Sequence, residues 1–205
     1  FLERLTPGGV LTVSRWYLRE FPHEMYRLAG LASTALRRLG IDEPREHVMI
    51  VRCMKRLLVT GRTVEEPDGV GVILVARERF SPEDVETIRR IARQMQFEVV
   101  FDPRFSADPI FSRLIASQDV ERVAKQLPLD VTPPTDDHPF FFHMLRLKDL
   151  FKPTVWDEGH TSFNLSAVVV LGTLLVLVFG LTTLCVYIPL RKLSRTEALR
   201  SAVPH

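Results

Sequence analysis

The feature that most constrains this chain is a run of 26 residues, Leu165 to Leu190, that contains no Asp, Glu, Lys, Arg or His. About 20 apolar residues are enough to cross the hydrocarbon core of a bilayer. Gly172 and Gly180 lie within the run and would let another transmembrane helix pack closely. The sequence therefore predicts an integral membrane protein whose partners are the lipid bilayer and other transmembrane helices.

The charges that flank this run bear on its orientation. The segment after it, RKLSR at 191–195, is basic, whereas Lys152 is the only Lys or Arg among residues 150–164. The positive-inside rule then puts the C-terminus in the cytoplasm and the preceding domain outside. Because long domains follow this rule poorly, the sequence leaves the orientation and the number of spans open.

The rest of the chain has the charge balance of an ordinary globular domain. Residues 1–164 carry 23 basic and 24 acidic side chains, and clustered cationic groups of the kind that bind phosphates are missing, so nucleic acid is not expected as a partner. The two cysteines, Cys53 and Cys185, have no metal-ligand spacing to another Cys or to a His, and no metal is expected. The motifs GxSxG, HExxH, CxxC and the P-loop are also missing, so hydrolase and ATPase functions lose their main support.

Alternating strand and helix patterns predict an α/β fold for the first part of the chain. Strands are expected at 10–13, 47–53, 70–76 and 97–101, and helices at 22–39 and 81–96, with one or two short helices between 109 and 127. The third strand comes after the second without a helical crossover, which predicts an antiparallel edge on an otherwise parallel sheet. No Gly-rich loop comes after the first strand, so half of a nucleotide-binding sheet would have to lie upstream.

These patterns divide the chain into four parts. We expect the α/β half-domain at 1–127, a Pro-rich linker and membrane-approach segment at 128–164, the transmembrane helix at 165–190, and a basic tail at 191–205.

The best-placed candidate ligand contacts are Ser14, Arg15, Trp16 and Tyr17, because ligands of open α/β sheets bind outside the carboxyl ends of the strands. Trp16 or Tyr17 could cover an adenine or form a wall of a substrate pocket, and Arg15 could hold a carboxylate. The alternative is a hydrophobic closure of the sheet end in which Arg15 pairs with an acid such as Glu20 or Glu24.

Asp136, Asp137 and His138 form the densest ionisable cluster, and His143 lies five residues after His138. Paired carboxylates can share a proton or hold an amine, and a nearby His can transfer a proton, so these residues are candidates for a catalytic role. The favoured alternative is structural, because Asp residues after Pro-Pro form turns and cap the next segment, while Phe140–Phe142 packs on the domain or at the bilayer interface.

Several of these segments together resemble membrane-embedded spermidine synthase-like proteins. They are LTPGGVLTVSRWY at 5–17, HVMIVR at 47–52, FSPEDVETIRRIARQMQFEVVFDP at 80–103 and PPTDDHPFFFHML at 133–145, of which TDDHPFFF is the most specific. The family is similar to aminopropyltransferases and class I methyltransferases. The resemblance implies the C-terminal half of a Rossmann-like sheet, with the fifth strand in residues 1–14 and the sixth and seventh in residues 47–76, before the transmembrane helix. The family pattern usually has Arg where this chain has His138.

The resemblance also implies a function. It implies transfer of an aminopropyl or methyl group from S-adenosylmethionine or decarboxylated S-adenosylmethionine to a small amine or other acceptor, in polyamine-type metabolism. The catalytic acidic motif and the donor-binding loop would lie upstream, so residues 1–205 alone are expected to be inactive. A cytosolic donor would place the α/β domain in the cytoplasm, at the cell (inner) membrane. The alternative is a non-catalytic sensing or regulatory module of a multi-pass membrane protein.

One residue argues against the polyamine putrescine as the acceptor. Soluble spermidine synthases present polar residues suited to an amine at the end of the fifth strand, where this chain has Arg15. A cationic Arg beside a dicationic amine costs electrostatic energy unless a carboxylate lies between them.

Overall fold

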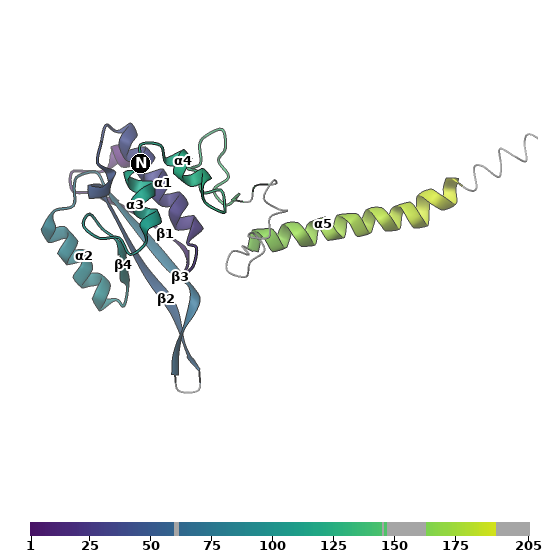
Figure 1. Ribbon diagram of the computed structural model, residues 1–205, viewed down its shortest axis with the longest axis horizontal. Helices are drawn as coiled ribbons and strands as arrows, with labels where there is room; N and C mark the ends of the chain where they lie inside the picture. The colour runs from purple at the N-terminus through teal and green to yellow at the C-terminus, as the bar shows by residue number, and fades with distance from the viewer. Residues whose placement is uncertain (60–61, 145, 147–162, 192–205) are drawn as a thin grey trace, which may run out of the picture. The chain divides into compact units, whose positions relative to one another are not determined.

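The computed structural model describes residues 1–59, 62–144, 146 and 163–191. It divides into two compact units, Phe1–His160 and Thr161–His205. The first unit is a mixed α/β domain, and the second contains a long apolar helix (Figure 1).

The domain is built on a four-stranded sheet with the order β1-β3-β2-β4. The strands are β1 (Val10–Leu18), β2 (Val48–Val59), β3 (Arg62–Ala76) and β4 (Glu98–Phe101). Every neighbouring pair is antiparallel. The sequence predicted an antiparallel edge on an otherwise parallel sheet. The described sheet differs because β3 turns straight back from β2 and enters between β2 and β1, which themselves run in the same direction.

The hairpin of β2 and β3 is longer than the sequence indicated. The sequence predicted strands only at 47–53 and 70–76, yet residues 54–59 and 62–69 extend both strands into a ribbon that projects beyond the sheet (Figure 1). The register shifts between Met54, which pairs with Gly69, and Arg56, which pairs with Glu65. This bulge places Pro67 outside the regular ladder, where its missing N–H costs no hydrogen bond.

Four helices form where their sequence patterns predicted them: α1 (His23–Arg38), α2 (Pro82–Gln94), α3 (Pro109–Ala116) and α4 (Val120–Lys125). Two short 3₁₀ helices, η1 (Leu2–Arg4) and η2 (Pro44–His47), were not among the expected elements. Helix α2 begins with a capping box, since the Ser81 hydroxyl accepts from the Asp84 amide and the Asp84 carboxylate accepts from the Ser81 amide.

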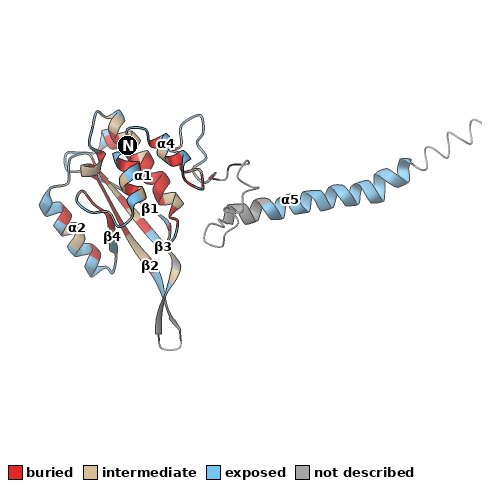
Figure 2. Cartoon of the chain, in the orientation of Figure 1, coloured by how far each residue is buried: buried red, intermediate tan, exposed pale blue. Residues whose placement is uncertain are grey.

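The core lies between α1 and one face of the sheet (Figure 2). Helix α1 packs on β1 and β3, while α3 and α4 pack on α1. Among the largest fully buried side chains are Tyr17, Tyr26, Phe101 and Phe111. The opposite face is less covered toward β1, where Val10, Trp16 and Val70 are 40%, 62% and 43% exposed. Part of the expected linker also belongs to the core, because Leu129, Val131 and Met144 are buried.

The second unit contains α5 (Phe163–Thr182), which continues as a π-helical turn, η5 (Thr183–Tyr187). Within Val169–Arg191 an 18-residue window has a mean hydropathy of 2.6, and among the described residues this is the one helix long and apolar enough to cross a membrane. Its described side chains are exposed within the chain (Figure 2). A lipid environment favours an apolar helix of this kind, which has no protein partner to cover it among the described residues.

Candidate functional site

The first candidate segment, Ser14–Tyr17, lies within β1, which runs to Leu18, beyond the 10–13 that its apolar pattern indicated. Side chains alternate between the faces of a strand, so Ser14 and Trp16 lie on one face and Arg15 and Tyr17 on the other. Trp16 is 62% exposed, whereas Tyr17 is 1% exposed on the α1 side of the sheet. The four residues therefore do not form a single ligand surface.

Tyr17 is a core residue. Its ring fills the space above Gly71, where an added Cβ would lie 2.9 Å from both Tyr17 and Met25. Arg52 donates a hydrogen bond to the Tyr17 hydroxyl at 3.4 Å, and its guanidinium carbon lies 5.3 Å from the centroid of the Tyr17 ring. Burial raises the pKa of Tyr17. These contacts favour the interpretation of Tyr17 as part of the hydrophobic closure of the sheet over that of a ligand contact.

The second candidate segment belongs to a closed loop, residues 130–144, which we call the 130–144 loop. Its ends meet where the Asp130 amide donates to the Met144 carbonyl at 2.8 Å. Within it, the His138 amide donates to the Thr135 carbonyl at 3.0 Å, which closes a tight turn around Asp136 and Asp137. These two aspartates and His138 are exposed. The turn-forming interpretation of the Asp136–His138 cluster is therefore favoured.

Arg27 of α1 organises the 130–144 loop from inside. Its side chain is 4% exposed. One terminal nitrogen donates to the carbonyls of Phe140 (3.2 Å) and Phe141, and the other donates to those of Asp130 (2.5 Å) and His143 (3.1 Å). Four carbonyl oxygens from one loop thus converge on a single buried guanidinium. Since a guanidinium has no acceptor, this arrangement is a scaffold and carries no proton-transfer chemistry.

The two candidate segments meet through aromatic contacts. The Phe141 ring contacts two guanidinium groups, with its centroid 5.5 Å from Arg15 and 5.8 Å from Arg27. Arg15 also lies 5.7 Å from the centroid of Phe142. The 130–144 loop therefore reaches β1 through Arg15 and two phenylalanines, and not through the Asp136–His138 cluster.

The charge environment of Arg15 differs from the expected alternative. No ion pair forms between Arg15 and Glu20 or Glu24, or with any other carboxylate in the part of the chain that the structure describes. Glu24 is half-buried, and its Oε2 atom is buried without a hydrogen-bond partner among the described residues. Burial raises the pKa of Glu24, and the charge of Arg15 partly opposes this.

A cavity of about 670 Å³ lies between the 130–144 loop and α4. Its lining includes Arg27, Asp130, His138, His143 and Lys125. Burial would raise the pKa of Asp130, but hydrogen bonds from Thr132 and the charges of Arg146 and Arg27 hold it below its usual value. Among the described residues, no group of three or more His, Cys, Asp or Glu side chains converges as a metal site would require.

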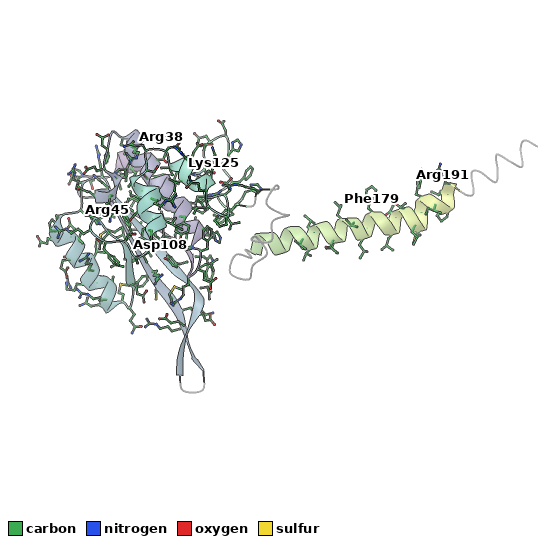
Figure 3. The ribbon with its side chains drawn as sticks, in the orientation of Figure 1. Arg38, Arg45, Asp108, Lys125, Phe179 and Arg191 are labelled. Carbon is green, nitrogen blue, oxygen red and sulfur yellow. The ribbon has the colours of Figure 1, made fainter. Side chains whose placement is uncertain are left out.

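Sequence reasoning did not identify several polar residues that the fold brings together. The Tyr26 hydroxyl donates to the Asp108 carboxylate at 2.5 Å, and Asp108 caps α3 by accepting from the Ile110 amide at 2.8 Å. Figure 3 labels Asp108 at the start of α3. The Asp-Pro pair at 108–109 is a helix-start signal that could have indicated the cap. Nothing in the local sequence indicates that Tyr26 is the partner.

Comparisons of the chain with protein-family models, with curated proteins and with solved structures found no match.

Proposed function

We propose that this chain is the C-terminal half of a membrane-bound, spermidine synthase-like transferase domain that uses an adenosyl sulfonium donor. The observation that carries the proposal is the open edge of strand β1. This nine-residue strand pairs with β3 on one side, and among the described residues nothing pairs with its other side. Long strands with an open edge are normally covered or paired, so the edge suits a further strand.

The exposed face next to this edge supports the same proposal. Val10 and Trp16 of β1 and Val70 of β3 are all substantially exposed there. Their side chains share one face, because Trp16 pairs with Val70 and Val10 lies an even number of residues from Trp16. A sheet that continued beyond β1 with its own helices would bury this apolar surface. Strands β1 and β2 run in the same direction, and β3 lies between them in the opposite direction. This arrangement is also compatible with the C-terminal strands of the proposed transferase domain.

The chain itself does not offer the residues that would hold an adenosyl donor. Its described part has no Gly-rich turn that connects the end of a strand to the start of a helix. The described residues therefore also lack the acid that would lie beside such a turn and bind the donor. Under the proposal these chain segments contribute the acceptor side of the domain, and donor binding belongs to the other half. Residues 1–205 alone should be inactive. A cytosolic donor would place the domain on the cytoplasmic side of the cell membrane, held there by α5.

A non-catalytic sensing or regulatory module is the second candidate. The observation that favours it is that Arg27 and the 130–144 loop use their polar groups to hold the segment that leads toward α5. Such a loop would suit a module that passes a conformational signal to the membrane.

Donor binding by the complete protein tests the transferase proposal. The protein encoded by the whole gene, purified in detergent, should bind S-adenosylmethionine or decarboxylated S-adenosylmethionine in a calorimetric titration, whereas residues 1–205 should bind neither. If the complete protein binds neither donor, the transferase proposal is wrong and the regulatory module becomes the better one.

Tryptophan fluorescence tests the half-domain arrangement separately. In a Trp156→Phe background, Trp16 is the one remaining tryptophan of residues 1–205. Its emission should be red-shifted in residues 1–205, where Trp16 is 62% exposed, and blue-shifted in the complete protein. Identical, solvent-exposed emission in both proteins would mean that no further part of the sheet covers β1.

A further inference from the structure

A groove of about 430 Å³, which we call the α1 groove, lies between α1 and the sheet near its β1 edge. Its volume is in the range of small-molecule sites, about 300–1,000 Å³. Most of its lining is aliphatic and comes from α1 and two strands, with Leu28, Leu31, Ala35, Leu11, Val13 and Ile73 among the lining residues. The core therefore continues outward as a concave apolar surface that the described residues leave open.

The α1 groove follows the helix over much of its length. Its lining residues on α1 extend from Leu28 to Arg38, which at a rise of 1.5 Å per residue is about 15 Å. The acyl chain of a lipid crosses one leaflet, which is about half of the 30 Å hydrocarbon core of a bilayer. A single alkyl chain therefore matches the α1 groove in length, and the mostly aliphatic walls match it in chemistry.

A cation lies at one end of the α1 groove. Arg38, labelled in Figure 3, is the last residue of α1, lines the groove and is exposed. In the part of the chain that the structure describes, Arg38 forms no ion pair. A guanidinium can donate two parallel hydrogen bonds to one carboxylate. The α1 groove and Arg38 together thus suit the two parts of a fatty acid, its alkyl chain and its carboxylate.

Two acids also line the α1 groove. Glu121 lies 3.0 Å from the Lys125 ammonium, which neutralises its charge. Glu3 is exposed and has no ion-pair partner among the described residues. A bound carboxylate would be attracted by Arg38 and repelled by Glu3, so the two charges should have opposite effects on its affinity.

We propose that the α1 groove binds a fatty acid, with the alkyl chain against the aliphatic lining and the carboxylate on Arg38. The same chain contains a helix long and apolar enough to cross a membrane, and a bilayer is a source of such ligands. A fatty acid is the proposed ligand and not a phospholipid, because the groove matches one alkyl chain and a phospholipid has two. The proposal rests on the α1 groove and Arg38 and does not depend on the proposed transferase function.

Photo-crosslinking in a bilayer tests the proposal. The complete protein, in nanodiscs of phosphatidylcholine, is irradiated with a palmitic acid that carries a diazirine on its chain, and labelled peptides are identified by mass spectrometry. The probe also dissolves in the bilayer, so labelling of α5 provides an internal reference in each sample. We expect label on peptides from β1 as well, and an excess of unmodified palmitic acid should remove the β1 label. A phosphatidylcholine with the diazirine on one acyl chain should label α5 and not β1.

A filled groove provides the first variant. Ala35 lines the α1 groove and is half-buried, so Ala35→Trp should place an indole in it and lower the β1 label, relative to that of α5, by about tenfold. Ala116→Trp is the matched control, because Ala116 is an exposed alanine at the end of α3 that does not line the groove. Its labelling should equal that of the wild type.

Charge-neutral variants identify the end that holds the carboxylate, and they lie at exposed positions where folding is not at risk. Arg38→Gln should lower the β1 label by up to about fivefold, as expected for an exposed ion pair, and Glu3→Gln should raise it. Arg37→Gln removes the neighbouring charge, which does not line the α1 groove, and should change nothing. Opposite shifts at two rim positions are a readout that a purely structural role of either residue would not produce.

Several results would overturn the proposal. Label on α5 alone would mean that the α1 groove holds no fatty acid in the complete protein. Equal β1 label from the phosphatidylcholine probe would identify a phospholipid site. A β1 label that neither Ala35→Trp nor Arg38→Gln lowers would place the ligand elsewhere. Failure of the complete protein to bind a sulfonium donor would refute the transferase and leave this labelling pattern unaffected, so the two proposals fail separately.

Discussion

Replacing Arg27 by Met should release the 130–144 loop while leaving the sheet intact. The substitution removes the guanidinium from four carbonyl oxygens and keeps a flexible side chain that can fill part of the same space. A hydrogen bond to a charged group contributes about 1.5–3 kcal/mol, but bonds that share one side chain do not add. The loop is also partly exposed, with Phe140 and Phe142 at 73% and 55%, so water can reach the carbonyls that lose their donor.

The expected cost is therefore about 3 kcal/mol, near the lower end of the cost of breaking a buried charged contact. If that cost falls on local opening of the loop, the opening equilibrium rises about a hundredfold, since each 1.4 kcal/mol is a factor of ten. The amides that report it are those of Asp130, His138 and His143, which donate to carbonyls within the loop.

Hydrogen exchange measured by mass spectrometry provides the assay. Peptides from 130–144 should exchange about a hundredfold faster in Arg27→Met, and peptides from β2 and β3 should be unchanged. Arg37→Met is the matched control, because Arg37 lies on the same helix and donates to the Asp42 and Ala116 carbonyls, away from the loop. If the loop exchanges at the wild-type rate in Arg27→Met, Arg27 does not hold it, and the argument from the four carbonyls fails.

Three further predictions concern the domain that carries the site. Gly71→Ala should destabilise it by about 1–3 kcal/mol in urea unfolding, because the new Cβ would lie 2.9 Å from Met25; a neutral result would mean that this contact relaxes freely. Ser81→Ala should cost about 1 kcal/mol through the lost cap with Asp84, whereas an unchanged unfolding midpoint would show that the capping box contributes nothing. Burial lowers the pKa of His23, so the unfolded state binds the proton first and stability should fall as the pH drops below about 6.5; His23→Gln should flatten that part of the pH profile, and an unaltered profile would exclude His23 as its source.

The elements that the sequence predicted are those whose signals are local. Helix α2 begins with Ser-Pro-Glu-Asp, and its cap, first residue and first-turn acids all lie within four consecutive positions. The run at 165–190 needs only composition to indicate a membrane-length helix. The two strands of the hairpin were predicted too short, because a bulge around Pro67 lets them continue past the expected ends at 53 and 70.

The organisation of the site depends on contacts that no local signal encodes. Arg27 lies within the amphipathic pattern of α1, between Tyr26 and Leu28, and nothing in that pattern distinguishes it from an ordinary helical residue. Its acceptors lie more than 100 residues further along the chain. The Asp136–His138 cluster attracted attention through its density of ionisable groups, whereas the contacts of this segment are made by the neighbouring Phe141 and by backbone carbonyls. The composition drew attention to the right segment because of its charged side chains, whereas its aromatic side chains make the contacts.

Arg15 is the residue at which the acceptor implied by the resemblance conflicts with the geometry. The resemblance implies a polyamine-type acceptor, and a polyamine places positive charge where this chain already has a guanidinium. Pairing with Glu20 or Glu24 would have neutralised Arg15 and removed the conflict, but neither ion pair forms. Instead, two aromatic rings hold Arg15 without reducing its charge. Function is determined by the groups that a site presents and not by the fold that carries them, so the charge of Arg15, which no described carboxylate pairs, argues against a dicationic acceptor beside it.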